Sequence, residues 1–201
     1  MFHGLQPGVA PAAVARLVEK LPTGCIEVVG AFESIGLYGE VDEVAWESAV
    51  LDAIQDSSKL SQRVHELPVC FELGLDTREV CQRLLLDVDQ LSKLICDQTY
   101  TCFAIGFVPG FPYCSGLPSI LENLARRPTP RARVPSGSVA IASGQLGIYP
   151  AEVPGGWNLI GRTPLQIADE GTDFFPISPG DALKLTRIGE AEFNQMVGKK
   201  L

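Results

Sequence analysis

The stretch that most constrains the fold runs from Ile105 to Thr163, where Gly and Pro recur every few residues between apolar runs. Glycine permits positive φ and close backbone approach, whereas proline fixes φ at about −65° and removes a hydrogen-bond donor. Turns that are specified one by one between short apolar segments are typical of an all-β barrel or sandwich. The stretch therefore predicts short strands joined by tight turns.

Two fragments of this stretch carry aromatic residues at tight turns. Phe107–Tyr113 (FVPGFPY) places three aromatic residues around a Pro-Gly turn, and Pro154–Trp157 (PGGW) places a tryptophan beside two glycines. Aromatic side chains at such turns can line a pocket for a flat or small polar ligand. They can equally pack the end of a barrel, and composition leaves both interpretations open.

The chain divides into two expected domains, residues 1–64 and residues 65–201. A polar, serine-rich stretch, Asp56–Gln62, is a plausible connector. The pattern before it is typical of a small α+β domain in which helices cover one face of a sheet. Its expected elements are a helix over Ala10–Leu21, strands over Cys25–Val29 and Ser34–Tyr38, and a helix over Val44–Ile54.

The second domain is expected to be mainly strands with few helices. Its two early helices carry Thr or Asp at the first position, where an N-cap is useful. The expected elements around the central stretch are a strand over His65–Phe71, helices over Thr77–Leu86 and Asp89–Asp97, strands over Thr99–Phe107, Leu165–Ala168, Phe174–Ile177 and Ala182–Arg187, and a helix over Glu190–Val197.

The net charge and the absence of a long apolar run indicate which partners and which compartment to expect. A net charge of −8 argues against nucleic acid and against an anionic membrane surface as partners. With no run of roughly 18 apolar residues and no signal-peptide pattern, we expect no membrane contact and a cytoplasmic location.

The six cysteines form no CxxC pair, so we expect buried free thiols and no zinc site. Cys114, which follows Tyr113, has no nearby His or Lys to activate it as a nucleophile.

No familiar catalytic constellation is present, so the catalytic residues stay unassigned and no metal site is expected. The chain contains neither a phosphate-cradling GxxxxGK loop followed by Ser or Thr nor a GxGxxG after an expected strand, so we expect no ATP bound by a familiar loop. The two histidines are His3, near the terminus, and His65, beside the connector. A Ser/His/Asp triad is therefore not expected.

Arginine is concentrated near the glycine-rich turns of this acidic chain. Arg126, Arg127, Arg131 and Arg133 fall within eight residues, and Arg162 stands beside Gly161 and Thr163. A planar guanidinium suits a carboxylate or a carboxyphosphate-like group through paired hydrogen bonds. For Arg126 and Arg127 we favour a solvated loop with structural ion pairs. For Arg131, Arg133 and Arg162, ligand binding and structural pairing both stay open.

Several long strings stand in one order between about Tyr100 and Asp181: GFVPGFPY, SGLP, PRARVPSGSVAIASGQLGIYP, PGGWNLIGRTP and PGD. Together they resemble the family of B subunits of prokaryotic ATP-dependent 5-oxoprolinase. That family is also described as allophanate hydrolase subunit 1 and as the sporulation kinase inhibitor KipI, and it is similar to part of the carboxyltransferase region of urea carboxylase. The resemblance implies an N-terminal α+β domain and a C-terminal cyclophilin-like β-barrel.

The resemblance also implies an activity that belongs to an assembly. With an A subunit and a homologous C subunit as partners, the family opens the lactam 5-oxo-L-proline to L-glutamate at the expense of ATP. A stable amide needs such activation before water attacks. The resemblance implies ATP at the level of the complex and no cofactor bound by this chain alone. This chain would supply one wall of a shared pocket, formed by Phe111, Tyr113, Arg131, Arg133, Gln145, Gly155, Gly156, Trp157, Arg162 and Thr163.

The chain departs from the family pattern at three places. The family opens with a strand before its first helix, whereas Met1–Val9 is mostly Gly, Pro and polar, which predicts an incomplete sheet edge. Glu72 and Leu73 replace a glycine pair. Ile95 stands five residues before Tyr100, where the family often carries a histidine. A divergent paralogue that keeps the barrel without the reaction is one consistent interpretation.

Two alternatives to the enzyme component stay open on sequence alone. One is a KipI-like inhibitor that docks on a histidine kinase through its barrel face, because an aromatic groove also suits a proline-containing peptide. The other is an allophanate hydrolase or urea carboxylase type of carboxyltransferase component, which would need a biotin-bearing partner.

Overall fold

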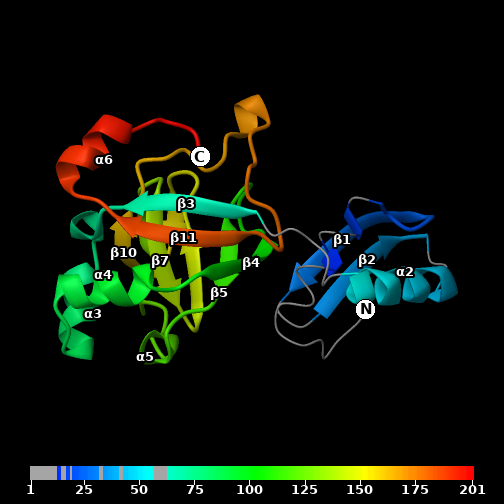
Figure 1. Ribbon diagram of the computed structural model, residues 1–201, viewed down its shortest axis with the longest axis horizontal. Coiled ribbons are helices and arrows are strands. Elements are labelled where there is room, and N and C mark those ends of the chain that lie inside the picture. Colours follow the sequence, from blue (N-terminus) through cyan, green and yellow to red (C-terminus); the bar gives the residue numbers. More distant parts are fainter. Residues whose placement is uncertain (1–12, 15–16, 19, 32–33, 41–42, 57–62) are drawn as a thin grey trace.

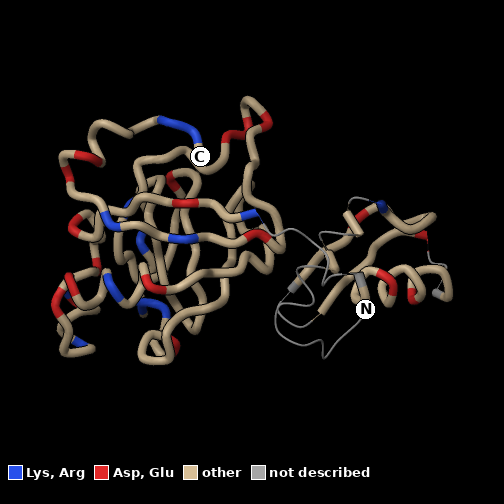
Figure 2. The backbone as a smooth tube through the Cα atoms, in the orientation of Figure 1, with Lys and Arg blue, Asp and Glu red and all other residues tan. Residues whose placement is uncertain are grey.

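A computed structural model describes residues 13–14, 17–18, 20–31, 34–40, 43–56 and 63–201 (Figure 1). The fold is mixed α+β, as expected, with one large barrel-like sheet and short helices. Acidic and basic positions are interspersed over the barrel unit (Figure 2). None of the helices in the described part of the chain is long and apolar enough to cross a membrane.

The N-terminal elements form a two-stranded sheet with one described helix beside it. Strands β1 (Cys25–Ala31) and β2 (Ser34–Gly39) pair antiparallel, and helix α2 spans Glu43–Asp56, so both strands and this helix are confirmed. Of the expected helix over Ala10–Leu21, the described residues 13–14 and 17–18 are helical. Residues 20 and 21 are described and are not helical. The other positions of this expected helix, the expectation for Met1–Val9 and most of the connector lie outside the described residues. The domain boundary at residue 64 therefore stays a prediction.

The large sheet has seven strands in the order β10-β7-β8-β5-β4-β11-β3. Its neighbours pair antiparallel except for the parallel pair of β11 with β3. An antiparallel bridge between Cys70, after β3, and Arg162, at the end of β10, brings the two outer strands together and nearly closes the barrel. The strands are β3 (Val64–Val69), β4 (Tyr100–Ile105), β5 (Pro112–Ser115), β7 (Ser138–Ala142), β8 (Gln145–Ile148), β10 (Asn158–Arg162) and β11 (Ala182–Arg187).

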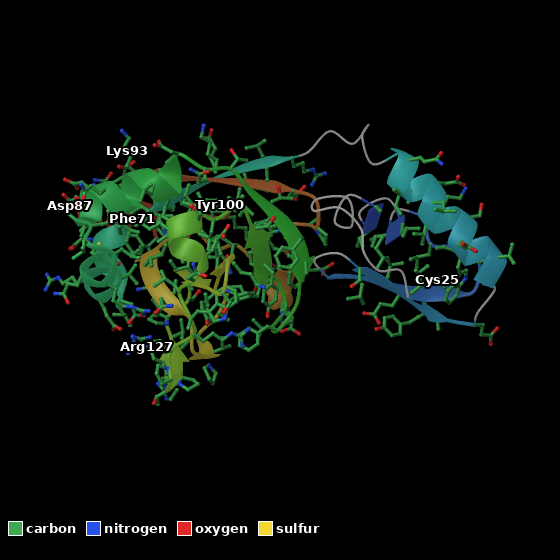
Figure 3. The ribbon with its side chains drawn as sticks, turned by 90° about the horizontal axis from the view of Figure 1, so that it is seen from below. Cys25, Phe71, Asp87, Lys93, Tyr100 and Arg127 are labelled. Atoms are coloured by element: carbon green, nitrogen blue, oxygen red, sulfur yellow. The ribbon has the colours of Figure 1, made fainter. Side chains whose placement is uncertain are left out.

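The barrel core is apolar and includes the position at which the family often carries a histidine. Ile95 is fully buried in the main core cluster, and the Tyr100 hydroxyl donates a hydrogen bond to the Ile95 carbonyl oxygen at 2.9 Å. Figure 3 shows Tyr100 and Phe71 in the barrel unit, beside the sheet and its helices. An isoleucine at position 95 therefore serves packing in this chain, because burial of its side chain stabilises the core.

Of the two helices before β4, the first begins at Thr77, as expected, and the second begins one residue earlier than expected. Helix α3 (Thr77–Leu84) follows Asp76, and α4 (Val88–Cys96) follows Asp87, whose carboxylate accepts a hydrogen bond from the Gln90 amide at 2.7 Å. The Gln90 side chain accepts one from the Asp87 amide in return, which completes a capping box. The expected caps at Thr77 and Asp89 are therefore wrong.

Two short strands expected after the central stretch do not form. Leu165–Ala168 and Phe174–Ile177 make only isolated bridges, from Gln166 to Lys200 and from Asp169 to Phe174. The Asp169 carboxylate accepts hydrogen bonds from the Gly171 amide (3.1 Å) and the Thr172 hydroxyl (2.7 Å), and this pairing folds the segment into a 3-10 turn, η3 (Glu170–Thr172). Strand β11 and a terminal helix, α6 (Glu190–Met196), are confirmed.

A second small sheet and two short helical turns complete the fold. Strands β6 (Arg131–Val134) and β9 (Val153–Gly155) pair antiparallel, beside a short helix α5 (Ser119–Glu122) and a 3-10 turn η2 (Phe71–Leu73). All six cysteines are free thiols, and five of them are buried, as expected.

Candidate functional site

The aromatic fragments of the central stretch meet at one pocket with a volume of about 270 Å³. We call it the aromatic pocket. Phe111 and Tyr113 come from the β4–β5 hairpin, Tyr149 follows β8, and Trp157 precedes β10. Phe107 and Arg126 lie at the same pocket. Four separate segments of the chain therefore converge on it.

Phe111 is the centre of the ring cluster that shapes this pocket. It is buried, and its ring centroid lies 4.9 Å from that of Tyr113, 5.1 Å from Tyr149 and 5.7 Å from Trp157. The contacts with Tyr149 and Trp157 are edge to face, which is a favourable geometry for aromatic pairs. Phe107 packs edge-on against Phe111 at 5.5 Å, yet 59% of it is exposed. The pocket thus has a fixed floor and an aromatic rim.

Glycine at position 155 permits the close approach of Tyr149. A Cβ at Gly155 would lie 2.2 Å from the Tyr149 hydroxyl oxygen, far inside van der Waals contact. A Cβ at Gly156 would lie 3.5 Å from Pro130 Cγ, and both residues line the pocket. Of the residues predicted from sequence, the structure brings together Phe111, Tyr113, Gly155, Gly156 and Trp157.

Burial changes the acidity of the two phenols of the aromatic pocket. It raises the pKa of Tyr149, and it raises the pKa of Tyr113 against an opposing effect of the Arg126 charge. Both hydroxyls therefore stay protonated at neutral pH and can donate hydrogen bonds. Among the described residues that line the pocket there is neither a carboxylate nor an imidazole. The arrangement is suited to holding a ligand rather than to moving a proton.

Arg126 supplies the positive charge at the rim of the aromatic pocket. Its guanidinium carbon lies 5.9 Å from the Trp157 ring centroid, and it forms no ion pair with a carboxylate of the described residues. Arg127 behaves differently, because it donates to Asp76 at 2.6 Å and to Glu79 at 3.0 Å. The expected structural ion pairs are therefore found for Arg127, which Figure 3 labels, whereas Arg126 faces the pocket.

Asp76 is a buried anchor that no sequence pattern singles out. Its carboxylate accepts hydrogen bonds from Arg127, from Arg131 at 2.5 Å and from the Leu159 amide at 2.8 Å. Arg131 is thereby committed to a structural ion pair. Arg133 is 81% exposed, with Glu152 at 3.7 Å. Neither of these two predicted site residues lines the aromatic pocket.

The remaining predicted residues lie elsewhere. Arg162 and Thr163 line a second cavity of about 400 Å³, together with Ser136, Gln166 and Phe193; we call it the polar pocket. Gln145 lies at the β7–β8 turn, opposite Ala142, and lines neither pocket. The single wall expected from the sequence is therefore divided between the two pockets, and Arg131, Arg133 and Gln145 line neither of them.

Three further groups that could take part in catalysis, His65, Asp181 and Cys114, have structural roles or are buried. His65 Nε2 lies 2.9 Å from Asp181 Oδ2, which also accepts from the Ser178 amide at 2.9 Å, so this pair organises the PGD turn away from both pockets. No local motif signals this pair, because its members are 116 positions apart.

Burial, with the neighbouring Cys102, raises the pKa of Cys114 well above its usual value, so Cys114 is not an activated nucleophile.

Comparison with known proteins places this arrangement in context. The family model described as carboxyltransferase domain, subdomain C and D matches residues 8–175. The chain is 32% identical over 206 residues to the 5-oxoprolinase B subunit of Bacillus subtilis (strain 168), covering 93% of this chain and 85% of that protein. It is 37% identical over 194 residues to the 5-oxoprolinase B subunit of Escherichia coli O157:H7, covering 90% and 88%.

Solved structures agree in fold. The protein PH0987 from Pyrococcus horikoshii is 30% identical, with a TM-score of 0.62 over 92% of this chain and 88% of that one. The protein TTHA0988 is 32% identical, with a TM-score of 0.74 over 93% of this chain, which spans only 38% of that longer protein. Urea amidolyase of Kluyveromyces lactis, at 15% identity and a TM-score of 0.64 over 93% of this chain and 14% of that one, shares the fold.

Proposed function

Because the chain belongs to the carboxyltransferase domain family and, within it, to the relatives of the 5-oxoprolinase B subunit, we propose that it is the B subunit of a 5-oxoprolinase complex. In this proposal the aromatic pocket forms one wall of the site that holds 5-oxo-L-proline. The A and C subunits are the partners. The two relatives compared support it because each is more than 30% identical and is matched over most of its length.

The observation that carries the substrate assignment is the position of Arg126 over Trp157 at the rim of the aromatic pocket. A five-membered lactam is small and nearly flat, so its ring faces suit the aromatic walls. Its carboxylate suits a guanidinium that has no carboxylate partner of its own among the described residues. The aromatic pocket thus has walls that match the lactam ring and a guanidinium that matches its carboxylate.

The neutral phenols supply the third element of recognition. Tyr113 and Tyr149 keep their protons because burial raises both pKa values, so they can donate to an amide oxygen. Ring opening consumes ATP and water and releases ADP, phosphate and L-glutamate. Because no general base lines the aromatic pocket in the described residues, activation of the lactam is assigned to the partners. This chain binds and orients the substrate.

The proposal is tested by observing Trp157 inside the assembled complex. The chain contains two tryptophans, Trp46 and Trp157. Labelled with 5-fluorotryptophan and combined with unlabelled A and C subunits, it gives two fluorine resonances, assigned with Trp46→Phe and Trp157→Phe. We expect 5-oxoproline to shift the Trp157 resonance saturably and to leave Trp46 unchanged. A Trp157 resonance that does not respond to saturating 5-oxoproline would contradict the proposal.

A further inference from the structure

We infer that the polar pocket is a second binding site, separate from the aromatic pocket, which takes a small carboxylic acid on Arg162. The inference does not depend on the proposed function. It rests on how Arg162 is held, on which of its hydrogen-bond donors are left over, and on what else lines the cavity of about 400 Å³ into which they open.

The backbone of Arg162 is fixed from two sides. Its amide donates to the Cys70 carbonyl and its carbonyl accepts from the Cys70 amide, both at 2.9 Å. On the other side, Arg162 is paired with Ser138 in the β10–β7 ladder. A residue held in this way at the closure of a barrel cannot shift its Cα without breaking the sheet. The position of the Arg162 side chain is therefore set by the fold.

The side chain of Arg162 is also oriented before any ligand arrives. Its Nε donates a 2.8 Å hydrogen bond to the Ser136 carbonyl oxygen. Its guanidinium carbon lies 5.8 Å from the centroid of the Phe193 ring, which comes from α6. Both contacts leave the two Nη groups unused, and Arg162 forms no ion pair with a carboxylate in the part of the chain that the structure describes. Such preorganisation lowers the entropy cost of binding an anion.

The lining of the polar pocket indicates the class of ligand. Arg162 is the one charged residue among the described residues that line it, so the charge matches a single anionic group. Two Nη donors in a planar fork fit a carboxylate in a bidentate manner. Thr163 Oγ1 accepts a bond from the Leu165 amide at 3.3 Å, which leaves its hydroxyl proton free to donate. The side chain of Gln166 adds an amide. A carboxylic acid with a second hydrogen-bonding group fits best.

The polar pocket is too far from the aromatic pocket to complete it. Strand β10 spans Asn158–Arg162, with Trp157 just before its start and Arg162 at its end. At ~3.3 Å per residue, the strand places the Cα atoms of residues 157 and 162 roughly 16 Å apart. A ligand as small as a five-membered lactam does not span that separation, and Arg126 lies near Trp157, so the two sites are separate.

The test uses the full chain labelled with ¹⁵N at arginine side chains, with the Arg162 Nε–H signal assigned from Arg162→Lys. N-acetylglycine is the probe because it carries a carboxylate and an amide; acetate, inorganic phosphate and acetamide are comparators. We expect a saturable shift of the Arg162 signal with N-acetylglycine, a weaker response to acetate and phosphate, and none to acetamide. No shift with N-acetylglycine, or an equal shift with acetamide, would overturn the inference.

Two further variants test the inference through the affinity for N-acetylglycine, a readout that does not need Arg162→Lys to fold. Gln166→Glu places a carboxylate in the polar pocket, so we expect the Arg162 signal to resemble the bound state and N-acetylglycine affinity to fall by about tenfold or more. Arg83→Gln, on the exposed face of α3, is the matched control and should bind like the unmodified chain. Undiminished binding by Gln166→Glu, or an equal loss in Arg83→Gln, would also overturn the inference.

Discussion

Cys70 and Arg162 exchange both of their backbone hydrogen bonds, each 2.9 Å long, although Cys70 directly follows β3 and Arg162 ends β10, the two outer strands of the seven-stranded sheet. Sheet edges expose unpaired donors and acceptors, and closing them into a barrel removes that exposure. Arg162 is therefore the residue that both closes the barrel and lines the polar pocket. Closure and binding depend on the same short segment.

A methyl group at Gly161 should disturb this closure. An added Cβ would lie 2.6 Å from Val69 Cγ1 and 3.3 Å from the Cys70 carbonyl oxygen. We expect Gly161→Ala to lower the free energy of unfolding by roughly 1–3 kcal/mol, because overpacking forces neighbouring groups apart. Urea titration gives the value. In the control variant Gly171→Ala, the added Cβ would lie 3.4 Å from Asp169 Oδ1, an ordinary contact, so the free energy of unfolding should change by less than about 1 kcal/mol. Equal effects of the two variants would count against this account of the closure.

Removing the charge of Asp76 should cost more than removing the charge of Glu79. Asp76 is 2% exposed and takes hydrogen bonds from Arg127, Arg131 and the Leu159 amide. Loss of a buried ion-pair partner typically costs about 3–5 kcal/mol, and we expect Asp76→Asn to cost roughly 3 kcal/mol because both arginines are partly exposed. Glu79→Gln, at an exposed pair, should cost less than about 1 kcal/mol. An Asp76→Asn variant as stable as the unmodified chain would show that the cluster is not an anchor.

The free energy of unfolding should fall as the pH rises into the alkaline range. Because of burial, three tyrosines and four cysteines have a pKa raised above their usual values: Tyr100, Tyr113, Tyr149, Cys70, Cys81, Cys96 and Cys114. In the unfolded chain these groups ionise at about 8.5 for Cys and about 10 for Tyr, so above those values the folded state holds more protons. The free energy of unfolding must then decrease as pH rises.

Urea midpoints under reducing conditions, compared between about pH 8 and about pH 10.5, check the sign of this dependence. Tyr100→Phe removes one of the raised groups and should make the fall with pH shallower in the upper part of that range. A midpoint that rises between the two pH values would refute the assignment of these groups as buried and neutral.

The exposed rim of the aromatic pocket should affect substrate binding and not folding. Phe107 has a φ of 66° and is 59% exposed, with its ring against Phe111. Phe107→Asn keeps a residue that tolerates positive φ but removes the ring. We expect the KM of the complex for 5-oxoproline to rise by about 2- to 10-fold, the equivalent of one aromatic contact, with an unchanged melting temperature. A KM equal to that of the unmodified complex would remove Phe107 from the site.

Local patterns predicted much of the fold and one half of the candidate site. Strand β11 and helix α2 follow from apolar spacing within the element itself, which needs no knowledge of distant contacts. The fragments around Phe111 and Trp157 carry turn residues that fix their own geometry, and they do meet at the aromatic pocket. What is encoded within a few residues could therefore be predicted.

The remainder depended on pairings between distant positions. The sequence leaves ligand binding and structural pairing both open for Arg131, because its partner Asp76 lies 55 positions away. The resemblance places Arg162 and Trp157 on one pocket wall, whereas in the structure β10 leads from one pocket to the other. For Arg126 the sequence favours a solvated loop with ion pairs, and only the fold places its guanidinium near the Trp157 ring. No local pattern contains these relationships, because each is set by how strands align in the barrel.

The measurement that tests the central claim most directly is ATP-dependent release of L-glutamate from 5-oxoproline by the complex of this chain with the A and C subunits. Arg126→Gln should lower kcat/KM by about tenfold or more, the equivalent of one lost charge-assisted hydrogen-bond pair, while Arg83→Gln leaves it unchanged. Size-exclusion chromatography confirms that each variant still assembles. A fully assembled Arg126→Gln complex that turns over at the unmodified rate would contradict the claim that the aromatic pocket holds the substrate.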